Sequence, residues 1–350
     1  MLPQAVLEKA QAELLDWQGT GMSVIETGHR TDQFKQLMKQ AENDLRLLLK
    51  IPNNYHVLFL GGAARTQFAM IPLNFLDKNQ QAAYLVSGIW SSIAFDEAKK
   101  SSNRIYCVAD SSSNGYINLP CASGWQLEDN TAYFYYTPNE TINGVQFHHL
   151  PDSGGVPLVA DMTSCILSEP IDVSRYGLIF AGAQKNIAAA GLTIIIVKDE
   201  WLATVSNKTL PSMFDYRVQA KYHSLYATPP VFSCYLAAQM FQWLKKQGGV
   251  EKLYEINCLK ASKLYQFIDS SPFYDCKVDK HARSIMNVCF SLNRTELEEP
   301  FLKEAEKNGL LALRGHRLTG GLRASLYNAM PMAGVDALID FMRYFAEANH

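Results

Sequence analysis

From residue 55 onward, short apolar runs alternate with longer amphipathic segments, and no other feature of this chain restricts its fold as much. Strand-like runs occupy 56–60, 82–86, 104–108, 131–136, 157–161, 178–183 and 192–197, and helical patterns follow the first two of them at 66–76 and 90–100. Strands that alternate with helices in this way form a mostly parallel sheet with helices on both faces. The pattern therefore predicts a large α/β domain.

The pattern changes after residue 229. A long apolar helical segment follows Pro229 and Pro230 and ends at two glycines, which suit the C-terminus of a helix. Beyond it we expect a helix near 251–269, strands near 285–292 and 321–327, and a last helix near 334–347. A chain of 350 residues is long enough for two cores. We therefore predict a large α/β domain over 1–250 and a smaller C-terminal α+β domain over 251–350, and the N-terminal helix is a candidate to pack on the smaller domain.

Charge and cysteine content narrow the classes of function. Lys and Arg total 32 against 34 Asp and Glu, a formal net charge of −2, which provides no general surface for a polyanion. Residues 1–17 alternate charged and apolar side chains, unlike a signal peptide or a membrane span. The seven cysteines include no CxxC pair and no metal-ligand spacing, as expected for thiols in a reducing compartment. We expect a cytoplasmic protein that binds no nucleic acid, no membrane and no metal.

Ligands of such sheets bind beyond the C-terminal ends of the strands, so the loops there are candidates for a site. The turn Gly61–Thr66 follows the first strand and leads into a helix, where small side chains let backbone N–H groups approach a phosphate. It matches neither GxGxxG nor GxxxxGK(S/T), which argues against dinucleotide-binding and P-loop sites. A tight strand-to-helix turn without a ligand is the alternative interpretation.

Three further loops carry a residue suited to chemistry. Asp161 ends an apolar strand, where a carboxylate needs a cation or several donors, although a helix N-cap is the alternative. Lys185 lies between apolar and small residues, and desolvation there would lower its pKa as Schiff-base chemistry requires, although a surface turn is the alternative. Trp90 is placed either to stack on a flat ring or to pack in the core. Together with the phosphate turn, these residues are typical of a site for pyridoxal 5′-phosphate (PLP), in which Lys185 holds the cofactor and Asp161 keeps the pyridine nitrogen protonated.

The chain also resembles a known family in segments spread along its length. These segments are SVIETGHR, PNETINGV, ILSEPIDVSRYGLIFAGAQKNIAAAGLTIIIV, ATPP and GHRLTGGLRASLYNAMP. They are similar to the phosphoserine aminotransferases, which belong to class V of the aminotransferases and to PLP fold type I. The similarity runs from Met1 to the last helix. It implies a large domain with a mostly parallel mixed sheet, a smaller C-terminal α+β domain, PLP as the cofactor, and a homodimer with shared active sites.

The resemblance implies a role for individual residues around the cofactor. Lys185 would carry PLP and move a proton between the substrate Cα and the cofactor C4′. Asp161 would pair with the pyridine nitrogen, Trp90 would stack on the ring, and Thr141 would hydrogen-bond the ring hydroxyl. The phosphate pocket would be formed by Ala64, Arg65 and Gln184, together with Ala227 and Thr228 from the other subunit.

Substrate recognition is implied for a second set of residues. The substrate phosphate or the side-chain carboxylate of glutamate would be bound by His29, Arg30, His316 and Arg317. Arg323 would bind the α-carboxylate, a two-point contact that suits its planar guanidinium. The implied reaction is a ping-pong transamination of L-glutamate and 3-phosphohydroxypyruvate to 2-oxoglutarate and O-phospho-L-serine, a step of L-serine biosynthesis. The related 4-phosphohydroxy-L-threonine step of vitamin B6 synthesis is a second reaction that the resemblance allows.

Three features depart from the family pattern. Family members usually begin with a strand resembling NFSxGPA, and this chain starts after that strand, so we expect its contact with the substrate to be absent. The turn GGAAR replaces a GGGR-like turn and restricts the backbone more. Ala227 replaces the asparagine of NTPP and loses one hydrogen bond to the cofactor phosphate. We expect these changes to affect affinity or activity.

Two other functions remain open. The first is another class V PLP enzyme, such as a desulfurase or an alanine–glyoxylate-type aminotransferase. A desulfurase needs a mobile nucleophilic cysteine, whereas Cys289 lies inside a predicted strand, and the cluster Gly315-His316-Arg317 favours a phosphorylated substrate. The second, from a different class, is a protein that binds PLP or the substrate with little turnover.

Overall fold

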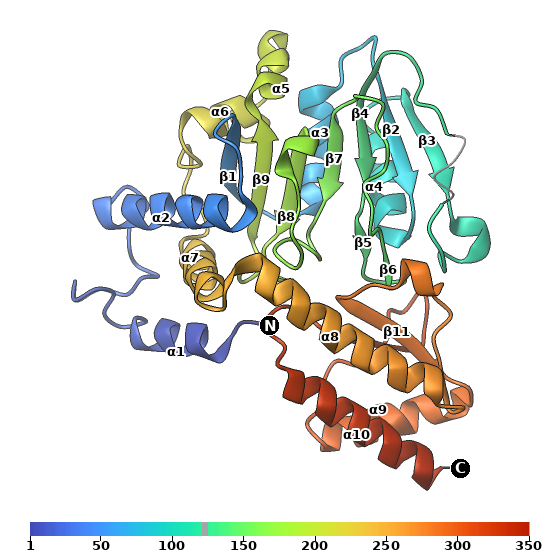
Figure 1. Ribbon diagram of the computed structural model, residues 1–350. Coiled ribbons are helices and arrows are strands. Elements are labelled where there is room, and N and C mark those ends of the chain that lie inside the picture. The colour runs from blue at the N-terminus through green and yellow to red at the C-terminus, as the bar shows by residue number, and fades with distance from the viewer. Residues whose placement is uncertain (121–124, 350) are drawn as a thin grey trace.

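The computed structural model describes residues 1–120 and 125–349, and its upper part is a seven-stranded sheet (Figure 1). β9 pairs antiparallel with both of its neighbours, and the pairs that join β8 to β3 are parallel. The predicted mostly parallel mixed sheet is confirmed, and each predicted strand run corresponds to one strand of it. In spatial order the strands are β1 (Tyr55–Gly61), β9 (Leu192–Lys198), β8 (Leu178–Gly182), β7 (Leu158–Asp161), β4 (Thr131–Tyr136), β2 (Gln81–Val86) and β3 (Ile105–Asp110).

The central strands send alternate side chains into two apolar layers. In β9, Ile194 and Ile196 belong to one buried cluster, whereas Ile195 and Val197 belong to the other. Because successive residues of a strand point to opposite faces, a strand that is apolar throughout needs cover on both faces. The continuous apolar runs in the sequence are explained by this two-sided burial.

Helices cover both faces of the sheet (Figure 1). On one face lie α2 (Asp32–Leu49) and α7 (Val231–Lys246), and on the other lie α3 (Arg65–Phe75) and α4 (Ile89–Lys99). The short helices α5 (Asp199–Ala203) and α6 (Tyr216–Lys221) contact β9 and β1.

The N-terminal helix α1 (Gln4–Ala12) packs against α7. Its buried residues Val6 and Ala10 belong to the same apolar cluster as α7, and the rings of Trp17 and Tyr235 meet edge to face at 6.4 Å. The expectation that this helix packs on the C-terminal domain is therefore wrong, because α7 covers its apolar side.

The C-terminal elements form a group of their own below the sheet (Figure 1). Their buried side chains make a separate apolar cluster, which supports the predicted division near residue 250, although that division stays a prediction. β10 and α9 were not expected from the sequence, because β10 has two residues and α9 starts in an acidic segment. The group comprises α8 (Gly249–Ser270), the antiparallel strands β10 (Tyr274–Asp275), β11 (Asn287–Leu292) and β12 (Leu322–Ser325), and the helices α9 (Glu298–Lys307) and α10 (Met332–Ala348).

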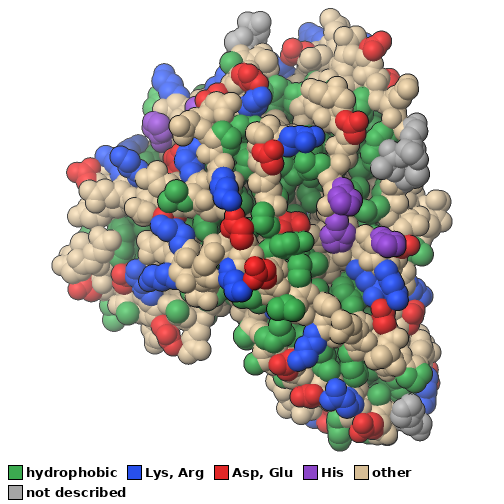
Figure 2. Space-filling model, viewed as in Figure 1, with side chains coloured by type: hydrophobic (Ala, Val, Ile, Leu, Met, Phe, Trp, Pro, Cys, Tyr) green, Lys and Arg blue, Asp and Glu red, His purple; other side chains and the backbone are tan. Residues whose placement is uncertain are grey.

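Acidic and basic side chains are interspersed over the face of the molecule seen in Figure 2. This distribution agrees with the balanced composition of the chain. Within the described residues, none of the helices combines the length and the apolar character that crossing a bilayer requires.

Candidate active site

A cavity of about 170 Å³ lies at the C-terminal ends of the parallel strands. Its wall comes from the turn after β1, the first turn of α4, the segment after β4, the end of β7 and the loop after β8. These five segments are distant in sequence and meet because their strands belong to one sheet. Six of the residues predicted for the cofactor site line this cavity, namely Ala64, Arg65, Trp90, Asp161, Gln184 and Lys185.

Asp161 is the last residue of β7, and its side chain is buried. Its Oδ1 accepts a 3.0 Å hydrogen bond from the backbone N–H of Thr163. Burial raises the pKa of the Asp161 carboxyl, and the bonds from Thr163 and the charge of Lys185 oppose that rise. A buried carboxylate of this kind is stabilised when a cation joins it.

Lys185 follows β8 and extends into the same cavity, with its Nζ 5.7 Å from the centre of the Trp90 ring. Burial lowers the pKa of the Lys185 ammonium, Asp161 raises it, and Arg323 lowers it. A lowered pKa increases the fraction of neutral amine, which is the form that reacts with a carbonyl.

The loop that carries Lys185 is fixed by the next residue, Asn186. Its Nδ2 donates to the carbonyl of Ile166 at 3.0 Å, and its Oδ1 accepts from the backbone N–H of Asn328 at 3.0 Å. Asn328 follows β12, so a C-terminal turn is bonded directly to the loop of the reactive lysine.

Trp90 is held at both its backbone and its ring. Its N–H donates to Oε2 of Glu140 at 2.9 Å, and its Nε1 donates to Oγ1 of Thr141 at 2.9 Å. The guanidinium of Arg65 lies 5.0 Å from the centre of the ring. These contacts orient the indole along the cavity wall, as stacking on a cofactor ring requires.

The turn after β1 presents the N-terminus of α3, which begins at Arg65 without a side-chain cap. Gly62 adopts a φ of 126°, whereas Ala64 has a φ of −52°, so the alanine needs no left-handed conformation. A Cβ atom on Gly182 would lie 2.6 Å from Oε1 of Gln184 and 3.1 Å from Cβ of Ala64. Glycine at 182 therefore lets these two residues approach each other beside the N-terminus of α3, where the helix dipole favours an anion such as a phosphate.

Arg323 lies on β12 and extends from the C-terminal part of the chain to Thr141, which is bonded to Trp90 of the cavity wall. Its Nη1 donates to the carbonyl of Thr141 at 3.1 Å, while its Nε is buried without a hydrogen-bond partner among the described residues. His316 lies near this group, because burial, Arg323 and Arg317 all lower the pKa of its imidazole. Among the described residues, Arg323 therefore has a buried donor that is unused and suited to an anion, and its charge and that of Arg317 both act on His316.

Four of the predicted residues line other cavities of the chain. His29 and Arg30 line a separate cavity between α2 and the region of α6. Ala227 and Thr228 line another, which they share with Gly61 and Thr66 of the phosphate turn. Within one chain, these four residues therefore lie outside the cavity that Lys185 lines.

Comparison with known proteins identifies the family of this chain. The family model of the class V aminotransferases matches residues 1–338. A phosphoserine aminotransferase of Legionella pneumophila (strain Lens) is 59% identical, over 100% of this chain and 96% of that protein. The solved phosphoserine aminotransferase of Bacillus circulans subsp. alkalophilus has a TM-score of 0.97 and 44% identity, over 100% of this chain and 97% of that one. The PLP-bound enzyme of Trichomonas vaginalis has a TM-score of 0.93 and 38% identity, over 98% and 97%.

The chain belongs to the phosphoserine aminotransferase family of class V aminotransferases. It is a PLP-dependent transaminase, and the cavity fits that cofactor. The hydroxyl of Thr137, which lines the cavity, is buried beside that of Tyr135, and neither has a further hydrogen-bond partner among the described residues. Asp161 is placed to hold a protonated nitrogen, Lys185 supplies an amine, and the start of α3 supplies the positive end of a helix dipole for the phosphate.

The desulfurase alternative is not supported at Cys289. This residue lies within β11, and its thiol contacts the carbonyl of Ile142 at 3.5 Å. Burial raises the pKa of the Cys289 thiol to about 12. A thiol so seldom ionised, in a strand rather than a mobile loop, is unsuited to act as a nucleophile.

Sequence reasoning missed Glu140 and Asn139, which both belong to the short strand β5 (Asn139–Glu140). Asn139 lines the cavity and donates from Nδ2 to Ser164 at 2.8 Å and to Asn287 at 2.9 Å. The one available signal was their position directly before Thr141 in the segment PNETI. Nothing in the sequence showed that both side chains would be buried.

Proposed function

We propose that this chain transfers the amino group of L-glutamate to 3-phosphohydroxypyruvate, giving 2-oxoglutarate and O-phospho-L-serine. One observation carries the proposal. Asp161, Lys185 and Trp90 line one cavity, and Arg323 is bonded to its edge through Thr141. The relative from Legionella pneumophila carries the name of this activity.

PLP, when bound, supplies a protonated pyridine ring that takes up the electron pair left at the substrate Cα. Asp161 holds the proton on the ring nitrogen, because a buried carboxylate favours an adjacent cation. Trp90 orients the ring by stacking on it. The hydroxyl of Thr141 accepts from Trp90 and keeps its own hydrogen for the ring hydroxyl.

Lys185 holds the cofactor between turnovers and moves the proton that the reaction shifts. Once its Nζ is released, it takes the proton from the substrate Cα and delivers it to C4′ of the cofactor. Its burial-lowered pKa suits both tasks, since the neutral amine accepts the proton and the ammonium returns it. Gln184, Arg65 and the first N–H groups of α3 anchor the cofactor phosphate away from the reacting atoms.

Substrate binding falls to the cationic group around β12. Arg323 binds the α-carboxylate through its unused donors, while Thr141 fixes the orientation of its guanidinium. His316 and Arg317 bind the phosphate of the oxoacid or the side-chain carboxylate of glutamate. The chemistry at Cα is the same for the precursor of 4-phosphohydroxy-L-threonine, so that oxoacid is a second substrate in this proposal.

The proposal includes a homodimer in which each site is completed by the other chain. The position of His29, Arg30, Ala227 and Thr228 outside the cavity of Lys185 in their own chain supports this proposal, in which a partner presents them. In a two-fold dimer such an exchange is reciprocal.

The surface beside Thr228 has the character of an interface. Met213 and Phe214 are 50% and 42% exposed, and Tyr222 and Tyr226 are also exposed. Large apolar side chains that gather on a surface in this way favour contact with another protein.

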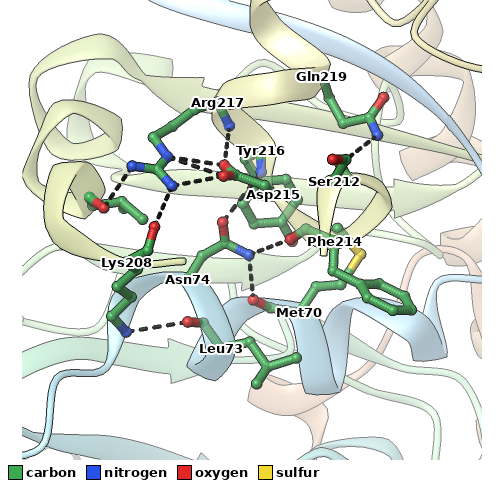
Figure 3. Close-up of polar contacts among 11 residues, drawn as sticks. Met70, Leu73, Asn74, Lys208, Ser212, Phe214, Asp215, Tyr216, Arg217 and Gln219 are labelled. Carbon is green, nitrogen blue, oxygen red and sulfur yellow. Dashed lines mark hydrogen bonds and ion pairs between the residues drawn. The ribbon is translucent and has the colours of Figure 1, made fainter. Parts of the chain in front are cut away.

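A polar cluster fixes this surface against α3 (Figure 3). Asn74 donates to the carbonyls of Met70 and Phe214 at 2.8 and 2.7 Å and accepts from the N–H of Tyr216 at 3.1 Å. Asp215 and Arg217 pair at 2.6 Å. The exposed apolar residues are thus presented by a rigid segment, which lowers the entropy lost when a partner binds.

A cytoplasmic location is part of the same proposal. Six of the seven cysteines lie within the described residues and are free thiols, whereas Cys121 lies outside them. Free thiols are usual in a reducing compartment.

The test is a transamination assay on the purified holoenzyme with glutamate as donor. We expect kcat/KM for 3-phosphohydroxypyruvate to exceed that for hydroxypyruvate by at least about a hundredfold, since two charge-assisted contacts to the phosphate are lost with the latter. Equal values would contradict the proposal, and a preference for glyoxylate would favour the alanine–glyoxylate type. A PLP absorbance that glutamate leaves unchanged would instead indicate a binding protein without turnover.

A further inference from the structure

Glu140 is a fully buried carboxyl that none of the steps above uses. It lies on β5, next to Thr141, and its two oxygens face the first turn of α4. Oε2 accepts from the N–H of Trp90 at 2.9 Å, and Oε1 accepts from the N–H of Ser91 at 2.8 Å. Burying a carboxyl is unfavourable unless such donors satisfy it, so its position calls for a physical reason.

The N-terminus of α4 explains the position of Glu140, because the cap residue of this helix, Gly88, has no side chain that could accept hydrogen bonds. The first N–H groups of a helix lack partners within the helix. Here the segment 140–143 provides them from another part of the chain, because Glu140 accepts from Trp90 and Ser91, and Asn143 Oδ1 accepts from Ile89 at 3.3 Å.

Gly88 makes room for this carboxyl. Its φ of −176° is extended backbone that any residue adopts, so conformation does not require glycine. A Cβ atom at this position, however, would lie 2.6 Å from Oε2 of Glu140 and closer still to its Cγ and Cδ. Glycine is therefore needed at position 88 because the side chain of Glu140 occupies the space that a Cβ atom would fill.

Two contacts then fix Trp90 relative to Thr141. The backbone of Trp90 is bonded to Glu140, and its indole is bonded to Thr141. The carbonyl of Thr141 in turn accepts from Arg323. The dipeptide Glu140-Thr141 thus joins the residue that stacks on the cofactor ring to the residue that binds the α-carboxylate.

We propose that Glu140 is a positioning residue of this site, which seats Trp90 and Thr141 against the PLP ring by capping α4. The inference rests on the proposed function, since it assigns a role within the same cavity. It predicts that a change at Glu140 weakens cofactor binding although Glu140 does not touch the cofactor.

The test compares Glu140→Gln and Gly88→Ala with Asp44→Asn as the matched control. Glutamine keeps the size of Glu140 but can accept from only one of the two N–H groups. Gly88→Ala leaves Glu140 in place and displaces it sterically. Asp44 is also fully buried and accepts from Gln40 and Lys245 at 2.9 and 2.5 Å, but it lies on α2 and does not line the cavity.

The measurements are the dissociation constant for PLP, from titration of the apoprotein, and the visible circular dichroism of the bound cofactor. We expect Glu140→Gln and Gly88→Ala to raise that constant about tenfold, the loss of one charge-assisted hydrogen bond, and to change the dichroism at the cofactor band. Asp44→Asn should lower the melting temperature while both cofactor readouts stay as in the parent protein.

Unchanged PLP affinity and dichroism in both variants would overturn the inference, and so would equal losses in Asp44→Asn. If Glu140→Gln does not fold, Gly88→Ala alone decides the question. The outcome is separable from the proposed function, because PLP titration needs no turnover. A parent protein that binds PLP without transaminating glutamate would refute the function and leave this comparison intact.

Discussion

The carbonyl of Thr141 accepts a 3.1 Å hydrogen bond from Nη1 of Arg323, which joins the residue after β5 to the middle of β12. The same threonine accepts from the indole of Trp90 through its hydroxyl. The indole of Trp90 and the guanidinium of Arg323 are therefore oriented by one residue. Because both are fixed before a substrate arrives, little side-chain entropy is lost on binding.

Arg323→Lys keeps the positive charge but removes the planar fork. We expect kcat/KM for glutamate to fall by about ten- to a hundredfold, as for the loss of one charge-assisted bond. Steady-state kinetics measure this, with Arg314→Lys as control, since Arg314 is an exposed residue paired with Glu299. If the two variants had equal kinetics, Arg323 would not bind the α-carboxylate.

Lys185→Ala should abolish both covalent attachment of PLP and transamination. Borohydride reduction followed by peptide mass analysis identifies the modified lysine in the parent protein. Lys260→Met is the matched control, because Lys260 is fully buried yet donates only to backbone carbonyls, those of Leu326, Tyr327 and Met330. It should lose stability and keep its reducible cofactor. A reduced PLP adduct in the Lys185→Ala protein would move the assignment to another lysine.

Asp161→Asn should retain PLP but slow the half-reaction with glutamate. The amide has no charge with which to hold a proton on the pyridine nitrogen, so the ring takes up the electron pair less readily. Stopped-flow absorbance after mixing with glutamate measures the rate. A rate equal to that of the parent protein would show that Asp161 has no part in holding the ring proton.

Stability should depend on pH through Glu140. Burial raises the pKa of the Glu140 carboxyl from 4.5 to about 7, and Asp161 acts in the same direction. Between these values the native protein binds more protons than the unfolded chain, so its free energy of unfolding falls as the pH rises. The change corresponds to about 3 kcal/mol at roughly 1.36 kcal/mol per pH unit.

Urea denaturation of the parent protein and of Glu140→Gln, at equal protein concentration, isolates this contribution. The stability of the parent relative to the variant should decrease from pH 4.5 to about 7 and stay level above that. A difference that is constant over this range would mean that Glu140 has an ordinary pKa.

Mixed dimers test whether the sites are shared. Thr228→Asp should repel the cofactor phosphate, and Lys185→Ala removes the chemistry, so each homodimer should be nearly inactive. If Thr228 serves the partner's site, one site of each hybrid carries both changes and the other carries neither. Purified hybrids should then regain about half of the parent activity, by counting sites under two-fold symmetry. Inactive hybrids would place Thr228 in the site of its own chain.

The sequence predicted most of the large sheet and one wall of the site. The central strands are apolar throughout because both faces are buried, and the four loops follow from where those strands end. Strand periodicity does not reveal that β9 runs against its neighbours, since β9 is as apolar as a parallel strand. Only the family resemblance implied a mixed sheet.

The sequence patterns could not predict contacts between distant segments. In the sequence, Glu140 is one acidic residue among many and Gly88 is a turn residue, and only the fold shows that the two are in contact. The position of α1 on α7 depends in the same way on which apolar surface remains uncovered. Sequence patterns fix the faces of helices and strands, but not the partners that those faces meet.

The reversal of β9 has a consequence for the reactive lysine. β8 ends and β9 begins at the same edge of the sheet, where Gly182 pairs with Thr193 and the N–H of Ala183 donates to Leu192 at 2.9 Å. The segment 183–191 is therefore a closed loop, held at both ends by adjacent paired strands, rather than the start of a long crossover. The entropy of closing this loop is already lost when the sheet folds, so Lys185 is confined beside Asp161 and Trp90 before any cofactor arrives.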